Sequence, residues 1–398
     1  MTATPDDPEN PKDLPTRQGT NQSGMRARNE RLVLSLVRRN GALSKSELAR
    51  LTGLSAQTVS VIMRALENDG LFKRGEPKRG RVGQPSVPMA LNPDAALFYG
   101  LKIGRRSIDL VLIDFLGNIV ERISAVYSYP ALSETLIFAQ SAFEQIQDRL
   151  SKDQKPRVVG LGIAMPYHLW EWAGPFDVPK GDMDAWKGVD LKKQLSEKLG
   201  IPVYVQNDAT AACGAELVFG TQGLLADFMY LYLGYFIGGG VVLGHKLCTG
   251  LTGNAGAFGA MPVLDDNGKM VQLLDVASLS VLEKTLIHHG QDASQIWLSS
   301  GNWNVDRNLL RNWSEHAGRG IAQAVVSATC TFDFPSVVIE GWMPPTIKSN
   351  LVHDIKTSLS KFATSGVQCP EVIEGDVGPD ARSLGAASLP LSDRYLLD

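Results

Sequence analysis

The sequence predicts a mixed α/β protein in which a small helical N-terminal domain precedes a two-lobed α/β body. Within Lys45–Gly70, apolar residues recur at three- and four-residue intervals on both sides of Gly53, which predicts two short helices joined by a tight turn. Beyond about residue 96, strand and helix patterns alternate, as is typical of α/β proteins. A strand–turn–strand segment occurs twice, at Phe98–Val120 and Phe228–Cys248, and predicts two lobes of similar topology that face a cleft.

Residues 1–25 are polar and proline-rich, which predicts a disordered tail. This stretch lacks the apolar centre of a signal peptide. A helix is predicted over Arg28–Asn40, with Leu32, Leu36 and Val37 facing inward. The first folded element therefore begins near residue 26.

The two short helices that follow have recognisable starting signals. Ser44 is a predicted N-cap with Glu47 three residues later, and Ser55 is the predicted cap of the second helix. The second helix has an apolar stripe formed by Val59, Ile62, Met63 and Leu66. Two helices around a glycine turn form a helix-turn-helix, whose second helix enters the DNA major groove. The predicted DNA contacts of this unit are Lys45, Ser55, Gln57, Thr58, Ser60 and Arg64.

A basic run broken by glycine and proline, Lys73–Gln84, predicts a β-wing along the DNA backbone. Its predicted contacts are Lys78, Arg79, Arg81 and Gln84. Residues 25–90 hold 13 Lys and Arg against 5 Asp and Glu, whereas the whole chain has a net charge of −3. A basic domain on an acidic body indicates phosphate binding, so double-stranded DNA is the expected partner of a winged helix-turn-helix at residues 26–90. The alternative is a helical protein-interaction domain with a solvated basic face.

Composition excludes several classes of protein. Hydrophobic residues make up 44% of the chain and charged residues 20%, as in ordinary globular proteins. No stretch approaches the roughly 18 consecutive apolar residues of a membrane span. The four cysteines are far apart and form no CxxC pair, so neither a disulfide framework nor a zinc cluster is predicted. A cytoplasmic location without a membrane partner is expected.

The predicted lobes occupy residues 96–212 and 213–379, and a closing helix over about 380–398 completes the first lobe. Asn92–Pro93 is the expected linker between the N-terminal domain and the body. The other strands are predicted at Arg157–Met165, Ile201–Val205 and Ser336–Gly341. The other helices are predicted at Leu132–Leu150, Leu191–Leu199, Val271–Ile287 and Leu309–Thr329.

Five segments occur in an order that resembles the ROK family, which groups repressors and sugar kinases on an actin-like, two-lobed fold. They are Gly160–Pro166 (GLGIAMP), Val205–Ala212 (VQNDATAA), Leu233–Gly240 (LGYFIGGG), Gly250–Pro262 (GLTGNAGAFGAMP) and Ser383–Ala387 (SLGAA). With the helix-turn-helix in front, the chain resembles the repressor branch from about residue 26 onward. The resemblance implies the sugar-kinase fold for the body.

The resemblance also identifies where this chain departs from the family's kinases. Their first hairpin loop has an aspartate and glycines that hold ATP phosphates and magnesium, whereas this chain has Lys102, Arg105 and Arg106. Magnesium requires oxygen ligands, which an ammonium group cannot supply. The loop is interpreted either as a solvated turn, which we favour, or as a residual anion site.

Two further nucleotide elements of the family are altered. The second phosphate loop keeps Gly238–Gly240, which can persist as hairpin geometry, but Tyr235 and Phe236 replace small or hydroxyl residues. The adenosine-contacting turn has become Glu340–Pro345, with a tryptophan and two prolines. We therefore expect no ATP binding, no catalysis and no cofactor.

The zinc signature of the family is also altered. Zinc-binding members use a histidine followed by three cysteines, but here Ala257 and Ala260 replace a glutamate and that histidine. No cysteine lies between Cys248 and Cys330. Zinc requires about four ligands, so no metal is expected. The two alanines also replace residues that normally fix sugar hydroxyls in this family.

The remaining candidates for effector binding are Asn207 and Asp208. In the family's kinases this aspartate is the general base, so the resemblance implies that Asp208 anchors a sugar hydroxyl here. The alternative is that both residues only cap the following helix. Further candidates that could stack on a sugar or bind its edge are Trp170, Glu171 and Trp172, with Trp186 nearby. These aromatic residues could instead pack between the lobes or at a dimer interface.

These observations predict a ligand-responsive transcriptional repressor of carbohydrate uptake or catabolism. A sugar effector would bind in the inter-lobe cleft, and a homodimer or tetramer would bind a palindromic operator. One rival is an active sugar kinase with a regulatory DNA-binding domain, supported by Asp208 and Gly238–Gly240. The other is a regulator that has lost its effector, which Ala257 and Ala260 support.

Overall fold

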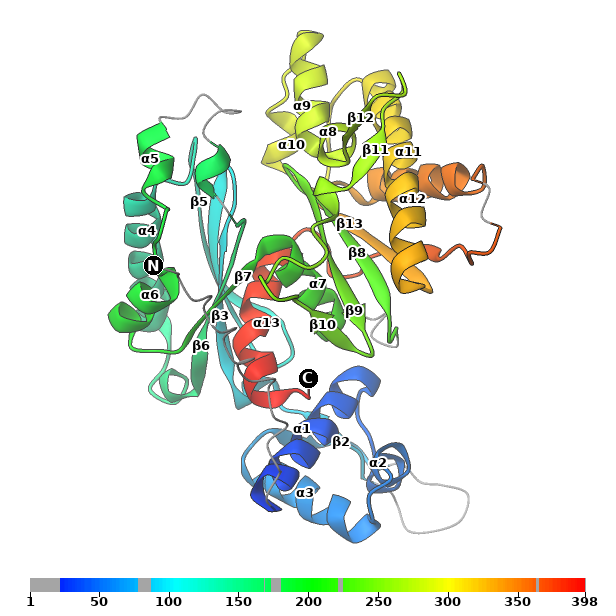
Figure 1. Cartoon of the computed structure of the whole chain (residues 1–398). Coiled ribbons are helices and arrows are strands. Elements are labelled where there is room, and N and C mark those ends of the chain that lie inside the picture. Colours follow the sequence, from blue (N-terminus) through cyan, green and yellow to red (C-terminus); the bar gives the residue numbers. More distant parts are fainter. Residues whose placement is uncertain are drawn as a thin grey trace, which may run out of the picture.

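The computed structural model describes residues 22–77, 87–167, 169–172, 180–220, 225–362 and 365–397. Its N-terminal domain (residues 22–91) contains α1 (Gln22–Asn40), α2 (Lys45–Thr52), α3 (Ala56–Asn68), β1 (Phe72–Arg74) and β2 (Met89–Leu91). β1 and β2 pair antiparallel and form the base of the predicted wing (Figure 1). α1 begins at Gln22, so the tail predicted for residues 1–25 overlaps the start of this helix. Residues 1–21 lie outside the described part of the chain.

The predicted helix caps of the N-terminal domain are confirmed. Ser44 Oγ accepts a hydrogen bond from the Glu47 amide at 3.3 Å, and the Glu47 carboxylate accepts one from the Ser44 amide at 2.8 Å. Gly53 ends α2 with φ of 69°, a conformation that favours glycine. Ser55 Oγ accepts from the Thr58 amide at 3.1 Å and starts α3. These local signals were sufficient to predict both helices.

The predicted apolar stripe of α3 is buried as expected. In α1, however, the most buried side chains are Val33, Leu34 and Val37, whereas Leu32 and Leu36 are only partly buried. Val37 is therefore confirmed as inward-facing, and Leu36 also packs against the apolar cluster of this domain. The stripe is displaced because α1 packs on the body as well as on its own domain.

The two lobes have the same sheet topology, which confirms the predicted repeat. The sheet of lobe 1 has the order β5 (Ile119–Val126), β4 (Ser107–Ile113), β3 (Leu97–Ile103), β6 (Val158–Met165) and β7 (Val203–Asn207). The sheet of lobe 2 has the order β10 (Lys246–Cys248), β9 (Ile237–Leu243), β8 (Phe228–Leu233), β13 (Ser336–Gly341) and β14 (Glu371–Glu374). In each sheet the first three strands are antiparallel and the last two add in parallel.

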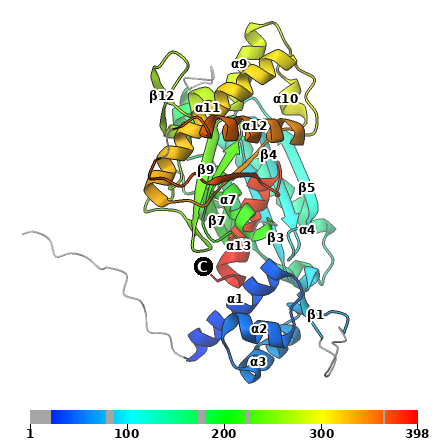
Figure 2. The ribbon, with the colours of Figure 1, turned by 90° about the vertical axis from the view of Figure 1, so that its right-hand side faces the viewer.

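Helices cover the outer face of each sheet and fill the space between the sheets (Figures 1 and 2). Lobe 1 carries α4 (Leu132–Arg149), α5 (Lys180–Asp184) and α6 (Leu191–Leu199), with short 3₁₀ turns at Pro93–Ala95, Lys155–Arg157 and Leu169–Trp172. Lobe 2 carries α10 (Gln295–Leu298), α11 (Arg307–Phe332) and α12 (Pro345–Leu359), with a 3₁₀ turn at Phe258–Ala260. Between the sheets, α7 (Asp208–Phe219) packs against α13 (Ala381–Tyr395).

The helix predicted over Val271–Ile287 is correct only in part. A short hairpin of β11 (Pro262–Leu264) and β12 (Met270–Gln272) precedes α8 (Leu274–Ala277) and α9 (Leu279–His288). Ser278 separates the two helices in an extended conformation and accepts a hydrogen bond from the Ile237 amide at 3.0 Å. This tertiary hydrogen bond therefore interrupts the helix that the apolar periodicity predicts.

Glycine at two positions lets α13 approach its neighbours closely. A Cβ atom on Gly162 would overlap the Ala386 carbonyl, and one on Gly385 would overlap the Ala211 carbonyl. The segments GLGIAMP and SLGAA thus have a packing role, because they place α13 directly on β6 and α7.

The predicted linker at Asn92–Pro93 is a packed segment. The Asn92 amide group donates to the Gly70 carbonyl at 2.8 Å, and the Phe115 amide donates to the Pro93 carbonyl at 3.0 Å. The N-terminal domain and lobe 1 also share one continuous apolar cluster, which joins Val33 and Val37 to Phe115. None of the helices in the described ranges combines the length and apolar content that a membrane crossing requires.

Candidate functional site: a DNA-binding surface and an inter-lobe cleft

The exposed face of α3 carries most of the predicted DNA contacts. Gln57 and Arg64 are exposed and Ser60 is partly exposed. Ser55 and Thr58 are also exposed, but their hydroxyl groups bond to each other at 2.9 Å as part of the helix cap. Their hydroxyl groups therefore take part in the cap that starts α3.

Lys45 is exposed at the first turn of α2, close in sequence to the cap of that helix. The predicted wing contacts Lys78, Arg79, Arg81 and Gln84 lie outside the described residues. At the base of the wing, Arg74 pairs with Glu67 at 2.6 Å, which connects β1 to α3.

Sequence reasoning missed Val61, whose side chain is 54% exposed on α3. It lies four residues after Gln57 and three before Arg64, so the three share one helical face. An apolar residue on an otherwise polar face was the available signal. A methyl-bearing side chain at this place can contact a thymine methyl in the major groove.

A cavity of about 530 Å³ lies between the lobes where the sequence placed the sugar site. The residues that line it include Arg105, Tyr167, Asn207, Asp208, Tyr235, Phe236, Thr252, Asn254, Ala257, Ala260 and Arg382. Ala257 and Ala260 therefore do face the site, as the resemblance implied. Thr252 and Asn254 supply hydroxyl and amide groups beside them, and sequence reasoning did not select either residue.

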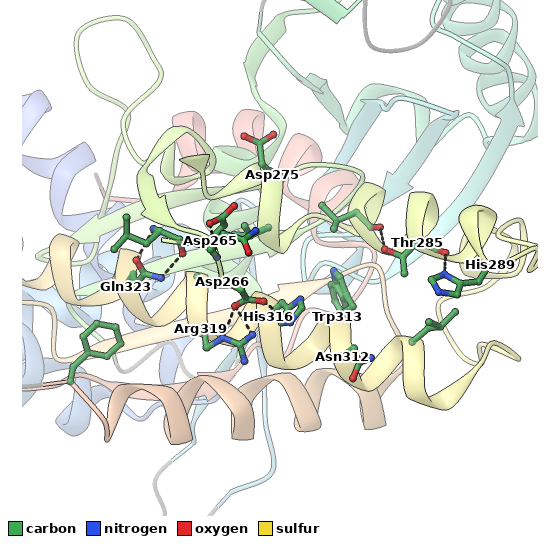
Figure 3. Close-up of a pocket in the computed structure, with 17 residues that line it drawn as sticks. Asp265, Asp266, Asp275, Thr285, His289, Asn312, Trp313, His316, Arg319 and Gln323 are labelled. Carbon is green, nitrogen blue, oxygen red and sulfur yellow. Dashed lines mark hydrogen bonds and ion pairs between the residues drawn. The ribbon is translucent and has the colours of Figure 1, made fainter. Parts of the chain in front are cut away.

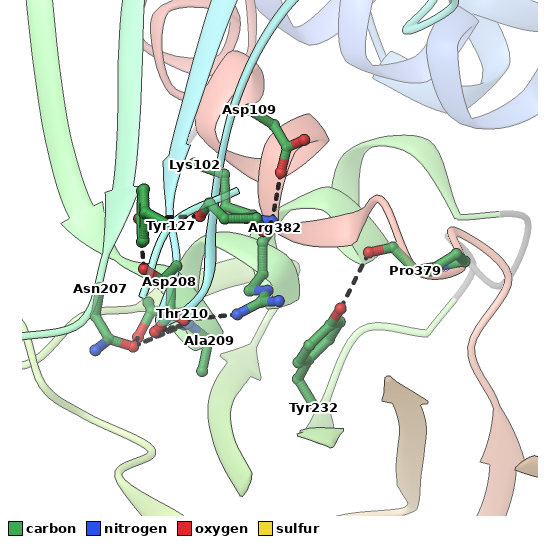
Figure 4. Close-up of polar contacts among 12 residues, drawn as sticks. Lys102, Asp109, Tyr127, Asn207, Asp208, Ala209, Thr210, Tyr232, Pro379 and Arg382 are labelled. Carbon is green, nitrogen blue, oxygen red and sulfur yellow. Dashed lines mark hydrogen bonds and ion pairs between the residues drawn. The ribbon is translucent and has the colours of Figure 1, made fainter. Parts of the chain in front are cut away.

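Asn207 and Asp208 lie at the start of α7 (Figure 4). Asn207 Oδ1 accepts hydrogen bonds from the amides of Ala209 at 3.0 Å and Thr210 at 3.2 Å, so Asn207 does cap the helix. Asp208 Oδ1 accepts from the Ala209 amide at 3.0 Å. Both residues nevertheless line the cavity, so the capping role and a role in the cleft coexist.

Asp208 also has a cationic partner that sequence reasoning missed. Arg382 Nη1 lies 3.3 Å from Asp208 Oδ2, and its guanidinium stacks 4.9 Å from the ring centre of Tyr232 (Figure 4). Burial alone would lower the pKa of Arg382, but Tyr232 and Asp208 raise it above its ordinary value. Burial also raises the pKa of Tyr232 to about 12. A permanent cation is thus fixed beside the predicted sugar anchor.

The interpretation of the loop after β3 as a solvated turn is wrong. Lys102 is only 7% exposed, forms an ion pair with Asp109 and donates to Ser107 Oγ at 2.9 Å. Burial, and next the charge of Arg382, lower the pKa of Lys102. The ion pair with Asp109 compensates the charge of the buried lysine. Asp109 lies on the adjacent strand β4, and the sequence pattern did not indicate that Lys102 and Asp109 are neighbours.

The two arginines of this loop reach across to lobe 2. Arg105 is 8% exposed, donates to the Ser128 carbonyl at 2.7 Å and lies 5.8 Å from the ring centre of Tyr235. Arg106 pairs with Glu283 of α9 at 3.1 Å. These contacts hold the lobes together above the cleft.

The three altered nucleotide elements surround one cavity of about 600 Å³. Its lining includes the loop after β3, Tyr235 and Trp342, with Trp297 stacked on Tyr235. Gly238 and Gly240 lie in strand β9 of the β8–β9 hairpin rather than in its turn. Added Cβ atoms there would lie 2.7 Å from Ala209 Cβ and 2.5 Å from Cys213 Cβ. Because these glycines have no side chain, α7 can pack closely against β9.

The aromatic candidates for sugar stacking are placed differently from expectation. Trp170 is partly buried against the core of lobe 1 and does not line the cleft cavity. Trp186 is 4% exposed and donates to the Pro130 carbonyl at 2.8 Å, so it belongs to the core. Packing within lobe 1 therefore explains the positions of Trp170 and Trp186. The side chains of Glu171 and Trp172 lie outside the described part of the structure.

A separate cavity of about 840 Å³ opens in lobe 2 beside the β11–β12 hairpin (Figure 3). Asp266 accepts from Arg319 at 2.7 Å and pairs with His316 at 2.6 Å, which ties the hairpin to α11. Within the described ranges, no three His, Cys, Asp or Glu side chains gather closely enough to hold a metal ion. The hairpin follows Ala257 and Ala260, and this charged cluster holds it against α11.

Known proteins resemble both parts of the chain. The family model described as ROK matches residues 98–392, and one described as winged helix-turn-helix DNA-binding matches residues 26–73. The xylose repressor of Bacillus subtilis is 27% identical over 383 residues, covering 92% of this chain and 96% of that protein. The transcriptional repressor Mlc of Escherichia coli is 27% identical over 228 residues, covering 55% of this chain and 54% of that protein.

Solved structures show the fold. A ROK family transcriptional regulator described as a homologue of E. coli Mlc aligns with a TM-score of 0.67 and 18% identity, covering 93% of this chain and 97% of that one. A ROK glucokinase from Streptomyces griseus, solved with glucose and AMPPNP, aligns with a TM-score of 0.57 and 20% identity, covering 74% and 99%. Since the ROK model matches more than half of the sequence, the chain belongs to the ROK family and carries a winged helix-turn-helix DNA-binding domain at its N-terminal end.

Proposed function

We propose that this protein is a transcriptional repressor of carbohydrate uptake or catabolism genes, released from its operator by a sugar or sugar-derived effector. The observation that carries the proposal is the packing of a winged helix-turn-helix onto a ROK body whose cleft retains Asn207 and Asp208. The names of two relatives, xylose repressor and repressor Mlc, support the same class of function.

DNA binding is assigned to the exposed face of α3. Gln57 has the paired donor and acceptor that recognise adenine, Val61 has methyl groups for a thymine, and Arg64 reaches a phosphate. A homodimer or tetramer would place two such helices in successive major grooves and bind a palindromic operator. Lys45 and the basic wing would hold the DNA backbone.

The effector is assigned to the cavity between the lobes. Asp208 and Asn254 would hold sugar hydroxyls, and Thr252 would replace part of the hydrogen bonding lost at Ala257 and Ala260. Because the N-terminal domain shares its core with lobe 1, closure of lobe 2 on an effector would change the position of lobe 2 relative to the bound DNA.

A kinase reaction is not part of the proposal. The loop that would hold phosphates presents Lys102, already paired with Asp109, where a magnesium ligand is needed. Trp297 and Trp342 stand in the cavity that the nucleotide would require. The cleft is therefore assigned to binding alone.

The effector site is tested by Asp208→Ala. We expect the variant to bind operator DNA as the wild type does but to lose its release by sugar, because the hydroxyl acceptor is gone. The measurement is operator binding by fluorescence anisotropy across a panel of monosaccharides, after the wild type has identified an active sugar. Asp148→Ala, which removes an exposed carboxylate on α4, is the control. Equal release of the Asp208 variant and the wild type would overturn the assignment.

The DNA surface is tested by Arg64→Ala. Loss of one phosphate contact should lower operator affinity at every salt concentration and reduce the slope of log K against log salt by about 1. Arg311→Ala, at a side chain that is 79% exposed on lobe 2, should change neither quantity. An unchanged affinity and slope for Arg64→Ala would remove this residue from the interface.

A further inference from the structure

A fourth cavity, of about 340 Å³, lies where the N-terminal domain meets both lobes. It is enclosed by α1, by α7 and α13 between the sheets, and by the β9–β10 hairpin of lobe 2. The polar residues that line it are Ser35, Arg38, Arg39, Gln206, His245, Lys246, Thr249, Ser388, Ser392 and Asp393. The cavity is distinct from the cleft that we assign to the effector.

The charge of this lining is predominantly positive. Arg38 and Arg39 enter from α1, and His245 and Lys246 enter from the hairpin, whereas Asp393 is the one carboxylate among the described lining residues. Asp393 already accepts a hydrogen bond from Tyr204 at 2.9 Å. Three permanent cations and one engaged carboxylate leave the cavity with an excess of positive charge.

Two buried nitrogen atoms of the lining, Arg38 Nε and His245 Nδ1, have no hydrogen-bond partner in the described structure. Another nitrogen of Arg38, Nη2, donates to the Phe115 carbonyl at 2.5 Å. His245 and Gly244 form the two-residue turn between β9 and β10, and such a turn requires a positive φ at both positions. Buried polar groups without a partner cost stability, so a ligand that pairs with both nitrogen atoms would be favoured here.

Burial disfavours the charged forms of Arg38 and His245. Burial lowers the pKa of Arg38 to about 10, although Asp114 partly opposes this change. Burial, and then the charge of Arg39, lower the pKa of His245, which Asp227 partly opposes. An anion bound in the cavity would stabilise the charged forms of both Arg38 and His245.

We propose that this junction cavity binds a phosphate group, either free or carried by a small metabolite. Guanidinium groups bind phosphate oxygens in paired, charge-assisted hydrogen bonds, and two arginines of α1 line the same cavity as a histidine and a lysine of lobe 2. The apolar remainder of the lining, which includes Leu217, Leu247 and Leu396, leaves room for the body of a small ester. A bound phosphate would join α1 to the hairpin of lobe 2 and fix the orientation of the DNA-binding domain.

The test is isothermal titration of the full chain with inorganic phosphate and with glucose 6-phosphate, in a chloride buffer of constant ionic strength. We expect binding of at least one of the two, and Arg39→Gln should weaken it about tenfold, since one charge-assisted hydrogen bond is lost. Glucose 6-phosphate binding alone would identify an ester as the ligand, and equal binding of both would identify the phosphate group itself.

Two further variants separate this cavity from other basic surfaces. Arg64→Ala, on the DNA-binding face, should bind phosphate as the wild type does, and Lys246→Gln should bind it more weakly. Both substituted side chains are exposed, so folding is not at risk. Absence of phosphate binding, or loss of binding in Arg64→Ala but not in Arg39→Gln, would overturn the proposal. Either result would leave the proposed repressor function standing, because that function rests on operator binding and sugar release.

Discussion

The N-terminal domain meets the two lobes in opposite ways. Against lobe 1, its residues join Phe98, Phe115 and Leu391 in one apolar cluster with almost no exposed surface. Against lobe 2, the contact runs through the turn of the β9–β10 hairpin, where His245 and Lys246 border a polar cavity. Apolar cores are closely packed and resist deformation, whereas a polar contact around a cavity can rearrange at a small cost.

This difference assigns a mechanical role to each lobe. Lobe 1 and the N-terminal domain should move as one body, with α13 as their shared element. Lobe 2 should move relative to both, and the hairpin should report that movement to α1. Coupling between an effector site and a DNA-binding domain needs an element with two arrangements. The contact between α1 and the β9–β10 hairpin, called the polar junction below, is a better candidate for this element than the apolar contact with lobe 1.

The apolar junction can be broken with Phe115→Ala. Phe115 is fully buried, its ring centre lies 5.0 Å from that of Tyr395, and Arg38 stacks on it at 5.2 Å. Removing a buried phenylalanine costs about 3–5 kcal/mol, so the free energy of unfolding should fall by this amount. The measurement is urea denaturation, with operator binding as a second readout.

The matched control is Phe332→Ala, at the exposed end of α11, where the side chain is 47% exposed. That variant should lose less than about 1 kcal/mol. If Phe115→Ala lowered the free energy of unfolding no more than the control does, the N-terminal domain and lobe 1 would not share a tightly packed core. The contrast between the two contacts would then fail.

The contact between the lobes can be weakened with Arg106→Gln, which removes the ion pair to Glu283. The Arg106 side chain is 50% exposed, so the pair contributes at most about 1 kcal/mol, or roughly a fivefold change in an opening equilibrium. Hydrogen exchange of amides in α9 and in the β3–β4 turn should accelerate by that factor. Arg149→Gln, which breaks a similarly exposed pair inside lobe 1, should leave those amides unchanged. Identical exchange in both variants would show that the pair does not hold the lobes.

Much of the fold was predictable because its signals are local. The caps at Ser44 and Ser55, the glycine after α2 and the repeated hairpins specify elements through residues a few positions apart. The failures occurred where distant contacts decide the outcome. Ser278 breaks a periodic helix to bond with Ile237, and Asn92 becomes part of a packed segment through its bond to Gly70.

The candidate site shows the same limit. Asn207 and Asp208 were identified because a resemblance placed them at the end of a strand, and the cavity does contain them. Arg382 was missed because it lies 174 residues from Asp208. Lys102 was misread because its partner Asp109 lies on the neighbouring strand, and only the pairing of β3 with β4 brings the two together.

The polar junction can be examined with His245→Asn, the change with the smallest expected effect. Asparagine tolerates the positive φ at this position but does not titrate. Because burial and Arg39 lower the pKa of His245 in the folded state, the folded protein binds this proton less readily than the unfolded chain. Its contribution to stability is therefore complete above the ordinary value near 6.5 and is lost as pH falls below it. The melting temperature of the wild type should drop more than that of the variant between pH 7.5 and 5.5 in phosphate-free buffer. If the difference in melting temperature between wild type and variant stayed constant over this pH range, the His245 side chain would be fully solvated. The contact with lobe 2 would then lack the buried charge that distinguishes it from the apolar contact with lobe 1.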